Sequence, residues 1–322
     1  MTMPETAPLT RKNAALLAVC AGLASAALFM LVLSGNLLGL FAAQMIPLPI
    51  WLIALAAGPT AAVIAVGTAA LLLSALIAAP VGIGFMIGFG LPVQFLAWVA
   101  LMGRTLPDGR REWLSTGWLT AAWVACGALV TVTAILALPG DSGAAEEQIR
   151  GVFSRLLETA LGQAGMPTDV TGVIEMMAAM PAIIVVSWML VHLVNGVIAQ
   201  ALLLKMGRAL GPAPTAASLV LPLDVAAVLA FAAAFGAFGQ DPGLAYIGRN
   251  LLLVTACAYL LAGFAAAHRW TADFKHRRWV LGGVYASAVL LQYPLIALAL
   301  IGLIDQLAQA RQRYAGDNPT GV

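Results

Sequence analysis

The sequence predicts an all-α integral membrane protein, a polytopic helix bundle with about nine transmembrane helices and a cytoplasmic N-terminus. Of the 322 residues, 62% are hydrophobic and only 9% are charged. A soluble domain carries about 25% charged residues, so that class is excluded. The apolar residues also gather in runs of about 20, the length that a helix needs to cross a bilayer. The runs lack the alternating polarity of a membrane β-barrel.

Nine apolar runs are the candidate spans. Each is long enough for one crossing, and polar connections separate most of them. In chain order they cover residues 13–34, 38–57, 59–77, 81–102, 114–138, 174–204, 218–238, 247–268 and 279–304.

Charge sets the expected orientation of these spans. Basic residues cluster in the segments 11–12, 104–111, 205–208 and 269–278, whereas the segment 141–169 is acidic overall. Because basic connections stay in the cytoplasm, the N-terminus is expected inside and the acidic segment outside.

The last run allows two interpretations. A simple span over 279–304 is favoured, because a kinked helix satisfies its backbone hydrogen bonds more easily than an irregular turn does in lipid. It would place Arg311 and Arg313 outside. A break at Gln292-Tyr293-Pro294 would instead give a re-entrant pair and keep both arginines inside.

The longest polar segment, 139–171, predicts an amphipathic helix. Between Phe153 and Leu161 its apolar residues recur every three or four positions. We expect this helix over 143–165, on the extracytoplasmic surface. A plain lid packed on the bundle, with no binding role, explains the pattern equally well.

Motifs for catalysis are absent from the sequence. It has no phosphate-binding loop, no zinc-protease motif and no nucleophile elbow, and no His, Cys or carboxylate set has metal-ligand spacing. We therefore expect no enzyme, no cofactor and no metal. A net charge of +2 without a long basic block argues against nucleic acid as a partner.

The glycines between Pro80 and Pro92 indicate close helix packing, or a loosened helix that lines a cavity.

Polar residues inside the apolar runs are the candidate ligand-binding residues, because they cost free energy in lipid and are rare there. His192 and Asn195 share a helix face near the middle of the sixth run. They either bind a small polar ligand or brace a neighbouring helix. The full candidate set is Gln44, Gln94, Glu175, His192 and Asn195.

The first run carries a stripe of small residues, which predicts close docking against another helix. That helix belongs either to the same chain or to another membrane protein. The stripe consists of Ala14, Ala18, Gly22 and Ala26.

Short motifs along the chain carry a family resemblance. They are the segments 45–50 (MIPLPI), 56–62 (AAGPTAA), Met180-Pro181, Asn195, 221–224 (LPLD) and 300–305 (LIGLID), followed by Arg311. Together they resemble the YybS-like family of bacterial membrane proteins, a domain of unknown function. The resemblance implies a multi-pass protein of the bacterial inner membrane. The first six spans of that family are similar to the S-components of energy-coupling-factor vitamin transporters and, more distantly, to the cell-shape protein MreD.

This similarity implies a six-helix unit over 13–204 with an extracytoplasmic pocket, three further helices over 205–305, and polar tails at 1–12 and 306–322. The expected function is binding of a small neutral or weakly polar solute in a transport-related role, with any ATPase on separate subunits. The stripe of the first run then resembles the face by which S-components dock on their membrane partner. The alternative is an MreD-like scaffold of the cell envelope or division machinery.

Overall fold

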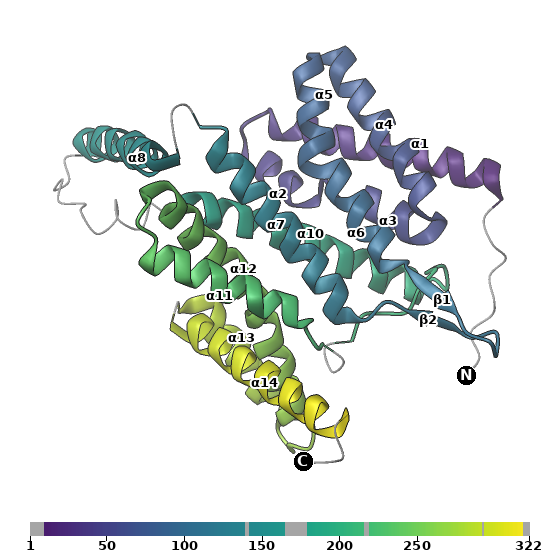
Figure 1. Cartoon of the computed structure of the whole chain (residues 1–322). Coiled ribbons are helices and arrows are strands. Elements are labelled where there is room, and N and C mark those ends of the chain that lie inside the picture. Colours follow the sequence, from purple (N-terminus) through teal and green to yellow (C-terminus); the bar gives the residue numbers. More distant parts are fainter. Residues whose placement is uncertain (1–9, 139–141, 165–178, 216–218, 292, 318–322) are drawn as a thin grey trace. The chain divides into compact units, whose positions relative to one another are not determined.

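The structure, a computed structural model, describes residues 10–138, 142–164, 179–215, 219–291 and 293–317. Apart from one short hairpin, the regular secondary structure of these residues is helical (Figure 1). The all-α membrane class is therefore confirmed.

The chain divides into two compact units. Unit 1 comprises Met1–Ser115 and Trp188–Pro214, and unit 2 comprises Thr116–Ser187 and Thr215–Val322.

Within the described residues, eight helical segments are long and apolar enough to cross a membrane. A ninth apolar helix, Leu223–Phe238, is shorter than these. The eight segments are Arg11–Val32, Leu37–Ala57, Pro59–Leu76, Ala79–Ala100, Thr116–Leu136, Met180–Lys205, Pro242–Trp270 and Tyr293–Gln312.

Unit 1 begins with four packed helices. Helix α1 (Arg11–Val32) packs against α2 (Leu37–Met45), α3 (Leu48–Ala57) and α4 (Pro59–Leu76). Thr10 caps α1, and its side chain accepts a hydrogen bond from the Asn13 N–H. Between α3 and α4, Gly58 has a φ of 91°, a conformation open to glycine, and Pro59 then starts α4 with its φ already helical.

The fourth span of unit 1 is interrupted by a π-helix. It consists of α5 (Ala79–Phe85), the π-helix η1 (Met86–Gly90) and α6 (Leu91–Ala100). Pro92 explains the interruption, because it has no N–H to donate to the Gly88 carbonyl one turn earlier. The Leu91 N–H bonds Met86 five residues back, and the Trp188 indole donates to the free Gly88 carbonyl over 2.7 Å. Both interpretations of these glycines find support, because a Cβ on Gly82 or Gly90 would clash with α4, while Met86–Gly90 forms a π-helical turn.

The basic connection after α6 is a β-hairpin. Strands β1 (Gly103–Thr105) and β2 (Arg111–Trp113) pair antiparallel, and the Arg104 guanidinium bonds the Glu112 carboxylate across them over 2.5 Å. In the turn, the Arg110 backbone N–H and then its guanidinium bond Asp108 and lower the pKa of that carboxyl.

Unit 2 is organised around α12 (Pro242–Trp270), which packs against α7 (Thr116–Leu136), α8 (Ser142–Ala164), α11 (Leu223–Phe238) and α14 (Tyr293–Asp317). Figure 1 shows α14 running alongside α12. Glycines permit this close approach. A Cβ on Gly302 would lie 1.9 Å from the Tyr259 carbonyl oxygen, and one on Gly263 would lie 2.0 Å from that of Leu298.

Helix α8 occupies the segment where the sequence predicts an amphipathic helix. Its Ala145 is fully buried and forms a small core with Ile135 of α7 and Tyr246 of α12. Beside this core the Glu146 carboxylate pairs with Arg150 and with Arg249 of α12. Apolar contact and charge therefore both hold α8 against the bundle.

The single span favoured over 279–304 is wrong. Helix α13 (Arg277–Leu290) ends before an extended Leu291, and α14 starts afresh at Tyr293. Pro294 accounts for the break, because proline clashes with the preceding turn of a continuing helix but is tolerated in the first turn of a new one.

The two units also differ from the expected division at residue 204. Helix α7, expected in the first unit, packs mainly against α12 and α8 in unit 2. Helix α10 (Met180–Lys205) contributes to both units. Its first turns belong to unit 2, where the Asn250 side chain of α12 accepts a hydrogen bond from the Ala182 N–H over 3.0 Å. From Trp188 onward, α10 belongs to unit 1.

Candidate functional site

His192 is buried in unit 1 and carries one unpaired ring nitrogen. It is only 1% exposed, and its Nδ1 lies 2.9 Å from the Trp188 carbonyl oxygen, one helical turn earlier. A carbonyl can only accept, so the neutral ring must hold its proton on Nδ1. Its Nε2 then carries no proton, and its lone pair can accept a hydrogen bond. Among the described residues, no group forms a hydrogen bond with this atom.

Aromatic rings from the π-helical region and α10 enclose the imidazole. The Phe89 ring stacks on it at a centroid distance of 6.0 Å, and the Trp188 ring lies at 4.5 Å. Trp188 therefore contacts both features. Its indole N–H donates to the Gly88 carbonyl of the π-helix, and its ring lies against His192. The proline in α6 therefore shapes the surroundings of the histidine.

Asn195, one turn beyond His192, presents a second unpaired acceptor. Its Nδ2 donates to the backbone carbonyls of Gln44 and Val191, each over 2.7 Å. Two carbonyl partners fix the amide orientation, because the oxygen cannot take the place of the donor. The Oδ1 atom points elsewhere. It is buried, and no described residue donates to it.

The other three predicted ligand residues have different outcomes. Gln44 meets Asn195 through its backbone oxygen, whereas its side chain is exposed. Gln94 on α6 has a buried Oε1 without a partner among the described residues. Glu175 lies outside the described residues. Unit 1 therefore brings Asn195 into contact with the backbone of Gln44, one turn from His192.

The structure adds aromatic residues that the sequence reasoning missed. Trp51 on α3 has a buried indole N–H to which no described residue offers an acceptor, and its ring lies beside Gly196, the neighbour of Asn195. Trp188 and Phe89 complete the surroundings of His192. The position of Trp188, four residues before His192 on the same helix face, was the available signal.

This arrangement is rich in acceptors and poor in donors. The buried unpaired atoms of unit 1 are two amide oxygens and one imidazole nitrogen against a single indole N–H, counted over the described residues. Each such atom costs about 1–3 kcal/mol when it stays unpaired. A molecule carrying O–H or N–H groups would remove that cost.

The small-residue stripe of α1 is covered within the chain. Ala18, Gly22 and Ala26 are buried, and Ala14 is half-buried. A Cβ on Gly22 would lie 2.3 Å from the Ala65 carbonyl oxygen of α4, so the two backbones nearly touch. The helix that docks on this stripe is therefore α4.

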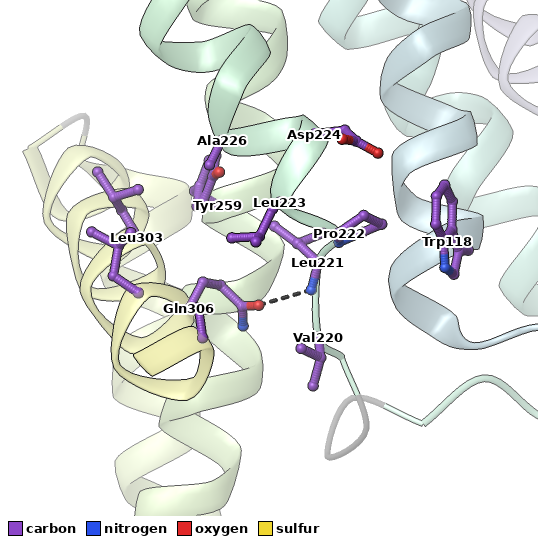
Figure 2. A pocket seen from close by; sticks show the side chains of 12 residues that line it. Trp118, Val220, Leu221, Pro222, Leu223, Asp224, Ala226, Tyr259, Leu303 and Gln306 are labelled. Atoms are coloured by element: carbon purple, nitrogen blue, oxygen red, sulfur yellow. Dashed lines mark hydrogen bonds between the residues drawn. The ribbon is translucent and has the colours of Figure 1, made fainter. Parts of the chain in front are cut away.

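Unit 2 holds a separate cavity of about 440 Å³. It lies where α7, the start of α11, α12 and the second half of α14 meet around a short extended segment (Figure 2). Its lining consists of Trp118, Val220, Leu221, Pro222, Leu223, Asp224, Ala226, Tyr259, Leu303, Gln306, Leu307 and Ala310.

One comparison with known proteins gives a match. The family described as "Predicted membrane protein (DUF2232)" matches residues 23–306, from the middle of α1 to the middle of α14. No curated protein and no solved structure matches the chain. Because the match spans most of the sequence, the chain belongs to this family of predicted membrane proteins.

Proposed function

We propose that this protein binds a small neutral or weakly polar solute within unit 1, in the bacterial inner membrane and in an S-component-like role. One observation carries the proposal, namely the buried acceptor pair formed by His192 Nε2 and Asn195 Oδ1. Both atoms lie on a membrane helix, where water is scarce and an unpaired polar group is costly.

The chemistry of this pair favours an uncharged solute with hydrogen-bond donors. A solute with two donor hydrogens, such as a primary amide or a diol, can donate one hydrogen bond to an imidazole nitrogen and another to a side-chain carbonyl. The aromatic rings of Phe89 and Trp188 offer flat apolar surface to the rest of the molecule. A carboxylate or phosphate would meet acceptors rather than donors.

The proposed role is non-enzymatic, because no nucleophile and base form a recognisable catalytic pair in the part of the chain that the structure describes. Any active transport would draw on separate ATPase subunits, since the sequence has no phosphate-binding loop. The alternative is an MreD-like scaffold that binds no solute. Co-purification in mild detergent separates the two roles, because a scaffold would bring envelope or division proteins with it and no ATPase.

The test is the thermal unfolding midpoint of the full chain in detergent, measured with a panel of vitamins and neutral metabolites. A solute at 100 times its Kd stabilises the protein by about 2.7 kcal/mol and raises the midpoint. In His192→Phe, an aromatic ring replaces the imidazole and the Nε2 acceptor is gone. We expect this variant to fold and to lose the midpoint shift.

His276→Phe is the matched control, because His276 is exposed and precedes α13 in unit 2. It should keep the full shift. Absence of any shift across the panel, or an undiminished shift in His192→Phe, would contradict solute binding at this site.

A further inference from the structure

The cavity of unit 2 is formed around an extended piece of backbone, residues 219–222, which leads into α11. Such a segment needs partners for its peptide groups. Gln306 of α14 supplies them: its Oε1 accepts from the Leu221 N–H over 2.8 Å, and its Nε2 donates to the Leu219 oxygen over 3.2 Å. Figure 2 shows this amide reaching the Leu221 backbone.

Helix α7 holds the other side of the same segment. A Cβ on Gly117 would lie 1.6 Å from the Val220 carbonyl oxygen, so only glycine permits this approach. In Figure 2, Trp118 of α7 and Leu303 of α14 lie on opposite sides of the segment. The cavity walls are therefore fixed by a hydrogen-bonded amide on one side and by backbone contact on the other.

Two polar side chains that line the cavity take no part in holding the segment 219–222. The Asp224 carboxylate is exposed, and no Lys or Arg of the described residues forms an ion pair with it. Tyr259 is only 2% exposed as a residue, and its hydroxyl makes no hydrogen bond to a described residue. The cavity thus offers one negative charge and one hydroxyl.

The remaining walls are apolar and aromatic. Leu223 and Leu307 are each 47% exposed at the rim, and Trp118 is 51% exposed. Exposed tryptophan and leucine side chains on a membrane protein contact lipid, with tryptophan preferring the headgroup level. Of the described lining residues none is Lys or Arg, so an anionic ligand would find no opposite charge.

We propose that this cavity binds an aminolipid, with the lipid ammonium group paired to Asp224 beside the Trp118 ring and the acyl chains against Leu223 and Leu307. A carboxylate and an indole that line the same cavity can both attract an ammonium ion, the first through charge and the second through cation–π interaction. The Tyr259 hydroxyl donates to an ester or phosphate oxygen of the same lipid. This site is independent of the solute site in unit 1.

A purely structural role for Asp224 makes a different prediction. Asp224 lies in the first turn of α11, where a carboxylate is favoured by the helix dipole. In that case Asp224→Asn changes the stability of the protein but not its response to lipid. Lipid-dependent unfolding therefore separates the two explanations.

The experiment measures the unfolding midpoint of the detergent-purified full chain during titration with phosphatidylethanolamine, phosphatidylglycerol or free ethanolamine. We expect phosphatidylethanolamine to raise the midpoint and phosphatidylglycerol, which lacks the amine, to leave it unchanged. A shift with free ethanolamine as well supports the ammonium site and shows that the amine alone suffices. Equal shifts with both lipids, or no shift with either, would overturn the proposal.

Asp224→Asn should weaken phosphatidylethanolamine binding about tenfold, because the charge-assisted bond is lost. Asp273→Asn is the matched control, since Asp273 is an exposed acid that does not line the cavity. Ala226→Phe fills the cavity and should abolish the shift without changing charge. Retention of the full shift in both cavity variants contradicts an aminolipid site.

Discussion

The two units place polar groups in the membrane by different rules. In unit 1, prolines interrupt the helices, and backbone groups freed in this way bond distant side chains, as Gly88 bonds Trp188. In unit 2, helices approach closely at glycines, and charged side chains pair with each other, as Arg269 does with Asp305 over 2.5 Å. Close packing at glycine is common to both units, since Gly22 of unit 1 also lies against the α4 backbone. Among the described residues, the buried unpaired atoms of unit 1 are mostly acceptors, whereas those of unit 2 can all donate a hydrogen bond.

Glycine packing in unit 2 should give the largest single effect. Gly302→Val would push a side chain into the Tyr259 carbonyl and separate α14 from α12. We expect a loss of about 3 kcal/mol or more, measured as a lower unfolding midpoint and less monodisperse protein.

Gly282→Ala is the control for this variant, because a Cβ there meets nothing within 4 Å. It should stabilise α13 by up to about 1 kcal/mol through helix propensity. Similar behaviour of the two variants would show that unit 2 does not depend on close backbone contact.

The π-helix of unit 1 can be tested by a double-mutant cycle. Trp188→Phe removes the donor to the Gly88 carbonyl and should cost about 1–3 kcal/mol. Pro92→Ala restores a backbone N–H one turn after Gly88, so the same Trp188 change should cost less than about 1 kcal/mol in that background. Equal costs in both backgrounds, measured by denaturant unfolding, would remove proline as the cause of the interruption.

The charged contact of α8 should have an intermediate effect. Glu146 is 22% exposed at its side chain and pairs with Arg150 and Arg249. Because Glu146 is partly exposed, its ion pairs should stabilise the fold more than surface pairs and less than fully buried ones. Glu146→Gln should therefore lower the free energy of unfolding by about 1–2 kcal/mol. Faster hydrogen exchange along α8 would report it.

Glu147→Gln provides the matched control on the next residue, because Glu147 is exposed and forms no ion pair with the described residues. It should leave exchange in α8 unchanged. If Glu146→Gln also leaves it unchanged, the apolar core around Ala145 alone holds α8.

The smallest effect is expected in the β1–β2 hairpin, which follows α6. The pKa of Asp108 is lowered from 3.8, first by the Arg110 backbone N–H and then by its guanidinium. Stabilisation from this carboxylate is present above its ordinary pKa and is lost as pH falls through the lowered value. Arg110→Ala should restore the pKa only in part in an NMR titration, because the backbone bond stays. A return of the Asp108 pKa to its ordinary value in this variant would show that the guanidinium alone lowers it.

The sequence predicted the membrane class because apolar run length is a direct physical requirement of the bilayer. It could not decide the path around Pro294, since a proline is compatible with a kinked helix and with a break, and packing selects between them. The acceptor role of Asn195 was foreseeable as a polar residue in a span. Its bond to the Gln44 backbone was not, because that contact joins positions 151 residues apart.

The division into units was also beyond the sequence pattern. Helix α7 is an ordinary apolar run, and nothing in its composition says that α12 is its neighbour. Glycines such as Gly117 mark a close approach only when the opposing backbone is known. Local pattern therefore defines the elements, and long-range shape decides which of them pack together.

The hydrogen bond from Trp188 to Gly88 has a consequence for how the protein is made. The two residues are 100 positions apart, so the fourth span leaves the ribosome long before its partner is synthesised. Until α10 follows, the Gly88 carbonyl has no donor from this indole. Biosynthesis of unit 1 is therefore not finished after its first four spans, but only when α10, which follows much later in the chain, supplies the missing donor.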